Sequence, residues 1–368
     1  MKIQVLQENL LKILTKAGRI ITTKTQLPVL QNLLLESHDN WLSVTSTNME
    51  TTIVTAIAVK EERSGKACVS AKLLTELVTS LPAETITLTE DNAALTVSAP
   101  RSKSVLTGMP PGEYPIVDMN QSGDAMTVDA ALFKQILSQT AFAAATDEGR
   151  PLLTGIKVKP VDGGTVFAAT DGYRLSVKQV DRKMKTLTDA VVPARTMLEV
   201  AKIAGEDKDV EKITIGKTKE GQLLFVIGET RVATRKIDGE YPDFERIIPK
   251  NHTTQADIEK SAMVLAVKSA AIFARDNANI VKLAFSDSGL VISANAPQVG
   301  SNTLDVDAAV TGDGGEIAFN SRFLLELLSN FPGEKVVFQM TGSLNPGVFL
   351  SPQDPSFTHI IMPVRLQG

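Results

Sequence analysis

One short pattern occurs three times along the chain: Ser70-Ala71-Lys72-Leu73-Leu74, Pro193-Ala194-Arg195-Thr196-Met197-Leu198 and Asn320-Ser321-Arg322-Phe323-Leu324-Leu325. Each copy predicts the start of a short helix, because Ser and Asn are favourable N-cap residues and Pro suits a helix start. The basic residues at the shared position, Lys72, Arg195 and Arg322, lie 123 and 127 positions apart. This spacing, about a third of the chain, indicates a threefold internal repeat.

Two further segment types occur in the same order and support the repeat. A longer amphipathic helix is predicted at residues 9–21, 130–143 and 261–274, where apolar residues recur at helical spacing. A closing segment spans residues 101–114, 231–241 and 358–366, and its first two copies contain Gly-Glu-Tyr-Pro around Tyr114 and Tyr241. We therefore predict three domains, at residues 1–121, 126–249 and 252–368.

Short alternating strands are predicted between these helices, for example at residues 41–45, 86–89 and 290–293. Two glycine-rich stretches, Asp162-Gly163-Gly164 and Gly312-Asp313-Gly314-Gly315, lie between strand-like runs, so strand-connecting turns are favoured over phosphate-binding loops. The predicted fold class is α+β, with two helices in each repeated domain.

The composition excludes several classes of protein. The chain has 368 residues, of which 43% are hydrophobic, and no apolar run approaches the roughly 20 residues of a membrane-spanning helix. The first residues alternate apolar with polar and do not resemble a signal peptide, so a cytoplasmic protein is expected. The single cysteine, Cys68, excludes an internal disulfide and is expected to be a small strand residue and not a reactive thiol. A formal net charge of −4 argues against whole-surface nucleic-acid binding but leaves room for one basic surface.

Few side chains suggest catalysis or metal binding. The three histidines, His38, His252 and His359, occupy non-equivalent positions in the repeats, and we expect them to be exposed or hydrogen-bonded and not ligands. The chain has no His-Glu-x-x-His motif, no paired cysteines and no Asp-x-Asp-x-Asp spacing. We predict no catalytic residues, no metal and no cofactor, although an enzyme whose site is assembled from scattered residues stays an alternative.

The repeated basic position is more informative. Equivalent residues of repeated domains occupy equivalent surface positions, so Lys72, Arg195 and Arg322 predict one cation per domain on the same face. Lys12 and Lys134 show a similar match in the longer helix type. Such a surface would contact phosphates without reading sequence, whereas the alternative is an ordinary exposed helix face.

Four motifs in order resemble the bacterial DNA sliding clamp family, the beta subunit of DNA polymerase III. They are residues 27–35 (LPVLQNLLL), 169–175 (ATDGYRL), 238–249 (DGEYPDFERIIP) and 361–366 (IMPVRL), and the resemblance covers essentially the whole chain. It implies three clamp domains with antiparallel sheets and two head-to-tail subunits in a ring, with helices lining the hole. Duplex DNA would pass through this homodimer without sequence specificity. The family is not catalytic.

The resemblance also implies a pocket between the second and third domains that binds a short linear peptide from partner proteins. The partners would be the DNA polymerase III alpha subunit, the clamp loader and other proteins with a clamp-binding motif. An extended peptide gains affinity by inserting apolar side chains into a preformed cleft. By resemblance the pocket comprises Leu153, Thr170, Gly172, Tyr173, Arg174, Leu175, Pro242, Arg246, Ile247, Asn320, Phe323, Ile360, Met362, Pro363, Val364 and Arg365.

DNA contacts and the subunit interface follow from the same resemblance. The DNA-facing residues would be Lys24, Lys72, Arg150, Arg195, Lys202 and Arg322, with Lys12 and Lys134 as further candidates, and the interface would include Ser104, Leu106, Ile272 and Phe273. The chain departs from the family at Pro151 and Leu152, where aromatic residues are expected, and at Tyr173, where histidine is common. Ser104 occupies an interface position where an aromatic residue would help. These departures put a base-stacking contact and the strength of the dimer in doubt, and a scaffold that does not encircle DNA is the alternative.

Overall fold

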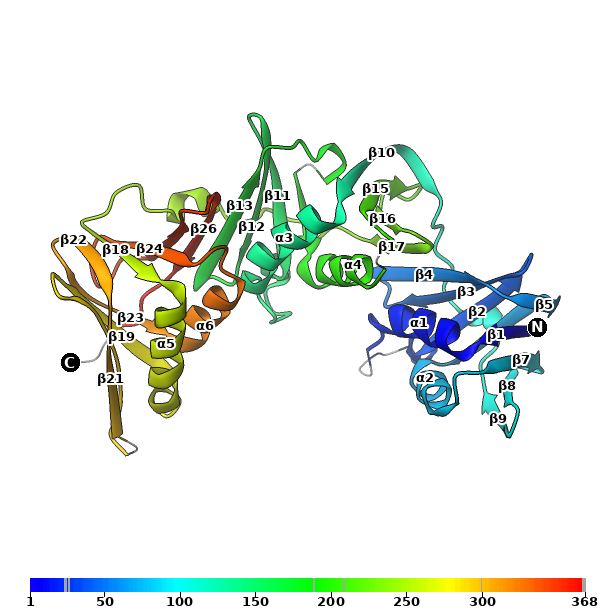
Figure 1. Cartoon of the computed structure of the whole chain (residues 1–368). Coiled ribbons are helices and arrows are strands. Elements are labelled where there is room, and N and C mark those ends of the chain that lie inside the picture. Colours follow the sequence, from blue (N-terminus) through cyan, green and yellow to red (C-terminus); the bar gives the residue numbers. More distant parts are fainter. Residues whose placement is uncertain (23–24, 26, 188, 208, 299, 366–368) are drawn as a thin grey trace. The chain divides into compact units, whose positions relative to one another are not determined.

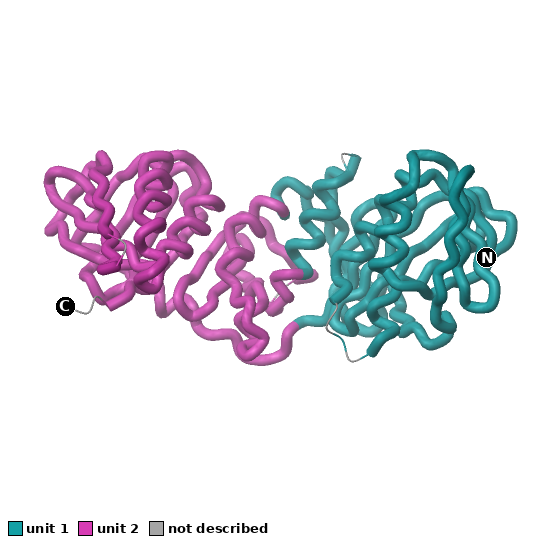
Figure 2. The backbone as a smooth tube through the Cα atoms, turned by 90° about the horizontal axis from the view of Figure 1, so that it is seen from below, with its two compact units in different colours: residues 1–133, 196–236 teal, residues 134–195, 237–368 magenta. Residues whose placement is uncertain are grey.

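The computed structural model describes residues 1–368 except 23–24, 26, 188, 208, 299 and 366–368. The chain divides into two compact units, residues 1–133 with 196–236, and residues 134–195 with 237–368 (Figure 2). The middle repeat therefore contributes to both units.

The first unit contains two antiparallel sheets (Figure 1). The smaller has the order β5 (Lys60–Arg63), β1 (Lys2–Leu6), β7 (Thr85–Asp91), β8 (Ala94–Ala99) and β9 (Ser102–Thr107). The larger has the order β10 (Gln121–Asp129), β15 (Lys212–Thr218), β16 (Leu223–Ile227), β17 (Thr230–Thr234), β4 (Thr51–Ala58), β3 (Trp41–Thr47), β2 (Asn32–His38) and β6 (Gly65–Ser70).

The second unit also contains two antiparallel sheets. The larger has the order β14 (Ala190–Pro193), β11 (Gly155–Val161), β12 (Gly164–Thr170), β13 (Arg174–Val180), β26 (Asp354–Ile361), β25 (Gly347–Ser351), β24 (Lys335–Met340), β18 (Thr254–Glu259) and β22 (Ala308–Gly312). The smaller has the order β21 (Gly300–Val306), β20 (Gly289–Ala296), β19 (Ile280–Ser286) and β23 (Gly315–Asn320).

The six α-helices of the described residues follow the threefold pattern. The first type gives α1 (Gln7–Gly18), α3 (Ala130–Thr140) and α5 (Lys260–Ala274), and the second type gives α2 (Ala71–Ser80), α4 (Ala194–Glu206) and α6 (Ser321–Asn330). The second type was predicted to be shorter, which is wrong for the middle repeat, because α4 has 13 residues and α3 has 11. The predicted caps are confirmed at two starts, where Ser70 Oγ accepts the Leu73 amide (3.4 Å) and Asn320 Oδ1 accepts the Arg322 amide (2.9 Å). A 3-10 turn, η3 (Ala141–Ala143), continues α3.

Each unit has a core where helices pack on both of its sheets. In the first unit, the apolar side chains of α1 and α2 pack with β1, β7 and β8 of one sheet and β2, β3 and β6 of the other. In the second unit, α5 and α6 lie side by side (Figure 1) over a core with four closely packed phenylalanines, Phe285, Phe319, Phe338 and Phe349. Burial of this apolar surface is the main favourable term for each unit.

The large sheets join strands of neighbouring repeats. We call the pairing of β17 with β4 the first seam, where Thr230–Thr234 run against Thr51–Thr55. We call the pairing of β13 with β26 the second seam, where Arg174–Lys178 run against Phe357–Ile361. Because main-chain hydrogen bonds continue through both seams, repeats that are separate in sequence share a sheet.

Two other predictions made from the sequence, for Cys68 and for the glycine-rich turns, are confirmed. Cys68 lies buried in β6, and burial raises the pKa of its thiol, with a smaller opposing effect from the Asn32 side chain. The Asp162-Gly163-Gly164 stretch connects β11 to β12, and the Gly312–Gly315 stretch connects β22 to β23. Among the described residues, no helix is long and apolar enough to cross a membrane.

Candidate binding site

A tight loop between β12 and β13 forms one wall of the predicted pocket. Its residues Thr170 to Arg174 are fixed by two short side chains: Thr170 Oγ1 donates to the Arg174 carbonyl (2.6 Å) and accepts the Gly172 amide (3.0 Å). Asp171 Oδ1 accepts the amides of Tyr173 (2.8 Å) and Arg174 (3.0 Å). Gly172 has a φ of +91°, a conformation that favours glycine. Thr170 is therefore buried scaffold, and Tyr173 is displayed outward.

A buried tyrosine, Tyr241, supports this loop through a hydrogen bond. The Thr170 amide donates to Tyr241 Oη (3.2 Å), and burial raises the pKa of Tyr241. Tyr241 packs with Leu175, Val348, Phe244 and Ile360 in one apolar cluster, and Leu153 packs against its edge. The Gly-Glu-Tyr-Pro motif thus contributes Tyr241 to the buried apolar cluster beneath the loop.

The last described residues close the site from the other side. Leu175 pairs with Ile360 across the second seam, and the Met362 amide donates to the Tyr173 carbonyl (2.8 Å). After Pro363, the Val364 amide donates to the Ala318 carbonyl of β23 (2.8 Å). Residues 362–364 therefore cross from the nine-stranded sheet to the four-stranded sheet, with both ends held by main-chain hydrogen bonds.

Three large apolar side chains stay exposed around this buried floor. Tyr173 is 59% exposed, Met362 38% and Ile247 37%. Ile247 ends a 3-10 turn, η6 (Phe244–Ile247), that follows the exposed Pro242. Exposed apolar side chains over a rigid apolar floor are typical of a peptide-binding surface.

Arg174 has a different position from the one expected of a peptide contact. Its side chain is only 7% exposed; Nε donates to Asp171 Oδ2 (3.1 Å), and the two terminal nitrogens donate to Glu326 Oε2 (2.5 Å) and the Phe142 carbonyl (2.7 Å). The guanidinium also lies over the Phe323 ring, 4.6 Å from its centroid. Arg174 therefore ties the loop to η3 and α6 and holds Phe323 in place.

The cations at the rim differ in their surroundings. Arg246 is exposed and paired with Asp243 (2.7 Å), while Arg365 is exposed at the chain's last described position. The Arg150 guanidinium lies 3.2 Å from the place that a Cβ at Gly172 would occupy, although the sequence predicted it as a DNA contact. Asn320 caps α6, one turn from Phe323. The structure thus gathers the predicted pocket residues on one region of the second unit.

The expectation for His359 is wrong. The residue lies within β26, fully buried, and neither ring nitrogen has a hydrogen-bond partner in the structure. Its ring stacks on Phe142, with centroids 5.2 Å apart, and lies near Phe357. Burial and then the charge of Arg174 lower the pKa of His359 well below its ordinary value. The residue is a neutral aromatic member of the core beneath Arg174.

The basic positions predicted for DNA are exposed, but two have close acidic partners that sequence reasoning missed. Lys202 Nζ donates to Glu199 (2.9 Å), and Lys12 donates to Asp207, which also accepts Lys16 (2.8 Å). The hydrogen bonds from Lys12 and then Lys16 lower the pKa of Asp207. Four other exposed basic side chains have no ion pair shorter than 4.0 Å among the described residues: Lys72 on α2, Lys134 on α3, Arg195 on α4 and Arg322 on α6. Lys24 lies outside the described residues.

The predicted interface residues lie on the edge strand of one small sheet and on helix α5. Ser104 and Leu106 belong to β9, which within the described residues pairs only with β8, and Leu106 packs partly on the core. Ile272 is exposed on α5, beside the half-buried Phe273. Val105 on β9 and Leu265 on α5 are also more than half exposed and were not predicted.

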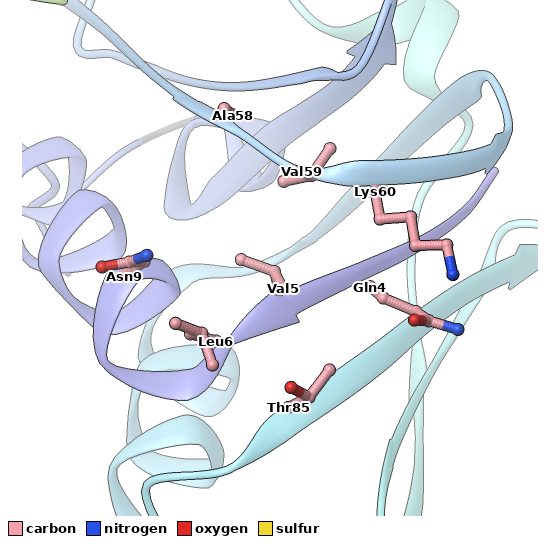
Figure 3. A pocket seen from close by; sticks show the side chains of 8 residues that line it. All are labelled: Gln4, Val5, Leu6, Asn9, Ala58, Val59, Lys60 and Thr85. Atoms are coloured by element: carbon pink, nitrogen blue, oxygen red, sulfur yellow. The ribbon is translucent and has the colours of Figure 1, made fainter.

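A separate shallow hollow lies at the start of α1 in the first unit (Figure 3). Gln4, Leu6, Lys60 and Thr85 are among the residues that line it. Of its described lining residues only Lys60 is ionisable, so the hollow has no acid–base pair. The described residues also contain no group of three or more His, Cys, Asp or Glu side chains that would hold a metal ion.

Known families and structures match the chain over its length. The N-terminal, central and C-terminal domains of the DNA polymerase III beta subunit match residues 1–118, 127–243 and 245–365. The beta sliding clamp of Synechococcus elongatus is 30% identical, with all of both chains covered. Crystal structures of the sliding clamps from Bacillus subtilis (TM-score 0.92) and from Bartonella birtlesii bound to griselimycin (TM-score 0.93) are each 25% identical and cover all of both chains.

The threefold repeat, the sheets shared between repeats and these matches agree over all three domains. The chain therefore belongs to the family of bacterial beta sliding clamps, the beta subunit of DNA polymerase III.

Proposed function

We propose that this clamp tethers replication and repair proteins by binding a short linear peptide of each at the second seam. The observation that carries the proposal is the set of exposed apolar side chains, Tyr173, Ile247 and Met362, around the buried floor of Leu175, Tyr241 and Ile360. Peptide side chains would insert against this floor. Thr170 and Arg174 would act indirectly, by fixing the loop. The griselimycin-bound clamp of Bartonella birtlesii is a relative of the same fold.

We also propose that two copies form a closed ring, head to tail. Each chain has a five-stranded and a four-stranded sheet, with β9 and β21 at their open ends. Pairing of β9 with the partner's β21 would give nine strands, as in the large sheet of the second unit. Leu106 and Val105 on one side, and Ile272, Phe273 and Leu265 on the other, would supply apolar contact.

Duplex DNA would pass through the ring and meet the cations of the helices. Lys72, Arg195 and Arg322 lie at equivalent, exposed positions, and Arg150 and Lys202 would contribute less because one lies near the peptide loop and the other is paired. Phosphate contacts carry no sequence information and permit sliding. The clamp would act without catalysis, cofactor or metal, in the cytoplasm. Reversing the charge of these three residues together should reduce the salt dependence of DNA retention, and an unchanged salt slope would contradict the DNA surface.

The first test of the peptide site is a titration. A labelled peptide with the clamp-binding motif of a bacterial polymerase would be titrated against the whole chain and a version that ends at Ile361. Micromolar binding that disappears on truncation is expected, and equal affinity for both forms would remove the site assignment. Mass in solution then separates the ring from a scaffold that does not encircle DNA, because the scaffold would be monomeric.

A further inference from the structure

The first seam carries a copy of the loop that builds the second-seam site. Residues Thr47-Asn48-Met49-Glu50-Thr51 stand 123 positions before Thr170-Asp171-Gly172-Tyr173-Arg174, the same spacing as between Lys72 and Arg195. Thr47 Oγ1 donates to the Thr51 carbonyl (3.2 Å) and accepts the Met49 amide (3.1 Å). Asn48 Oδ1 accepts the amides of Glu50 (3.1 Å) and Thr51 (2.8 Å). Each bond has its counterpart in the second loop.

The surroundings of the loop are repeated as well. The Thr47 amide donates to Tyr114 Oη (3.1 Å), as the Thr170 amide does to Tyr241. The Arg235 amide donates to the Glu50 carbonyl (3.0 Å), as the Met362 amide does to the Tyr173 carbonyl. A 3-10 turn, η1 (Pro28–Gln31), stands where η4 (Pro151–Thr154) stands in the second site, and it buries Leu30 at the position of Leu153. The first unit alone contains all of these parts.

Three of the exposed side chains on this frame are apolar, whereas Glu50, at the position of Tyr173, is exposed and charged. Met49 is 47% exposed, Leu27 50% and Ile116 85%, and they occupy the positions of Gly172, Arg150 and Asp243 in the second site. Met49 has a φ of +75°, where a residue other than glycine is strained. Glycine at position 49 would give the same loop without strain, so the fold does not require this methionine. Methionine is well suited to contacts with varied partners.

The charges beside the loop favour an acidic partner. Arg235 is exposed next to the loop, where its amide bonds to the Glu50 carbonyl, and the second site has Met362 at this position. Arg231 is exposed further along β17, opposite Val54, and donates to the Met119 carbonyl (3.3 Å). These two cations outnumber the single exposed carboxylate of the loop, Glu50. Arg174, which braces the second loop, is replaced by the neutral Thr51. The first site thus combines exposed apolar side chains with two arginines on or directly after β17.

We propose that the first seam is a second peptide-docking site, which takes an extended peptide with apolar side chains flanked by aspartate or glutamate. The proposal rests on the peptide-binding function proposed above for the second seam. One clamp subunit would then hold two peptides, one in each of its two units, and two partner segments would be bound at the same time.

The experiment measures how many peptides bind per chain and where. The probe is the same polymerase peptide, followed by a version with two added aspartates and a photoreactive phenylalanine analogue. Native mass spectrometry counts bound peptides, and mapping of the crosslinks locates them. The full-length double variant Ile247→Glu/Met362→Glu disables the second-seam site, and Met49→Gly removes the displayed side chain at the first seam while keeping a loop that glycine adopts without strain.

Expected results are two peptides per wild-type chain at saturation, and one in the double variant, crosslinked within residues 47–52 or at Ile116. Adding Met49→Gly should weaken this remaining binding at least tenfold, and the added aspartates should strengthen it in wild type. One peptide per wild-type chain and none in the double variant would overturn the second site and leave the proposed function intact. A wild-type chain that binds no peptide would overturn both.

Discussion

The two seams have the same strand pairing, but their buried polar side chains differ: they are neutral at the first seam and charged at the second. At the first seam, buried threonines face one another, with Thr55 and Thr230 hydroxyl oxygens 2.9 Å apart and Thr51 and Thr234 hydroxyl oxygens 3.1 Å apart. At the second seam, buried Lys178 donates to both Asp354 oxygens (2.7 and 2.5 Å), and Arg174 and His359 lie close by. A single backbone frame can therefore be stabilised by neutral hydroxyl pairs or by ions, and only the second solution responds strongly to pH and to the loss of one partner.

The largest difference between the seams should come from Lys178→Met. Asp354 would keep hydrogen bonds from Ser356 and Gln139 but lose its only described cation, so we expect the second unit to lose about 3–5 kcal/mol of unfolding free energy. Native-state hydrogen exchange of β13 and β26 amides measures this loss. The matched double variant Lys178→Met/Asp354→Leu should recover most of it, and a single variant as stable as wild type would contradict the comparison.

Arg174→Met should have the next largest effect. It removes the ion pairs with Asp171 and Glu326 and the hydrogen bond to the Phe142 carbonyl, and we expect a loss of about 2–3 kcal/mol, since Glu326 is half exposed and can be hydrated. Peptide affinity should fall because Phe323 and the loop lose their support. Thr51→Val is the matched change at the first seam and should leave second-seam affinity unchanged. Normal peptide binding by Arg174→Met would exclude the bracing role.

Acidification should weaken the second seam by a smaller amount. The pKa of His359 is lowered in the folded state, so the unfolded chain binds a proton that the folded chain excludes. Stability is therefore lost as pH falls below about 6.5, by at most about 1.4 kcal/mol per pH unit. Hydrogen exchange at pH 7 and pH 5.5 should show faster opening of β13 and β26, with β17 and β4 unchanged. His359→Phe should abolish the difference, and an unchanged pH response in that variant would contradict this origin.

A second acidic transition should follow at lower pH. Burial alone would raise the pKa of Asp354, but the hydrogen bonds from Lys178, Ser356 and Gln139 outweigh it and lower that pKa. The stability from this carboxylate is present above its unfolded pKa near 4 and is lost as pH falls through the folded value.

Among the substitutions, the smallest effect is expected at the first seam, and it should not depend on pH. Thr55→Val leaves the Thr230 hydroxyl buried without its partner and should cost about 1–2 kcal/mol at every pH. Thr55→Val/Thr230→Val removes both hydroxyls and should be closer to neutral. The measurement is chemical unfolding followed by exchange of β17 and β4 amides. A cost above that of Lys178→Met would reverse the order of the two seams.

The sequence predicted the repeated helices well because local signals determine them. Ser70 and Asn320 cap their helices from one residue away, and apolar spacing alone gives α1 and α5. Sheet pairing between repeats depends on strands more than 170 residues apart, such as Thr55 with Thr230, and no local pattern reports it. The same holds for side-chain partners. Lys12 looked free in the sequence because Asp207 lies 195 positions away, and Arg174 looked like a ligand contact because Glu326 lies 152 positions away.

The open edges of β9 and β21 also bear on how assembly depends on concentration. Each copy has one edge of each kind, so in the proposed ring the first head-to-tail contact between two copies would leave one β9 and one β21 unpaired. If these two ends meet, the second contact forms within one molecule at a high effective concentration, and assembly stops at two copies. If a third copy arrives first, the same edges extend an open chain. Dilute protein thus favours closure, and crowding of newly made chains favours growth.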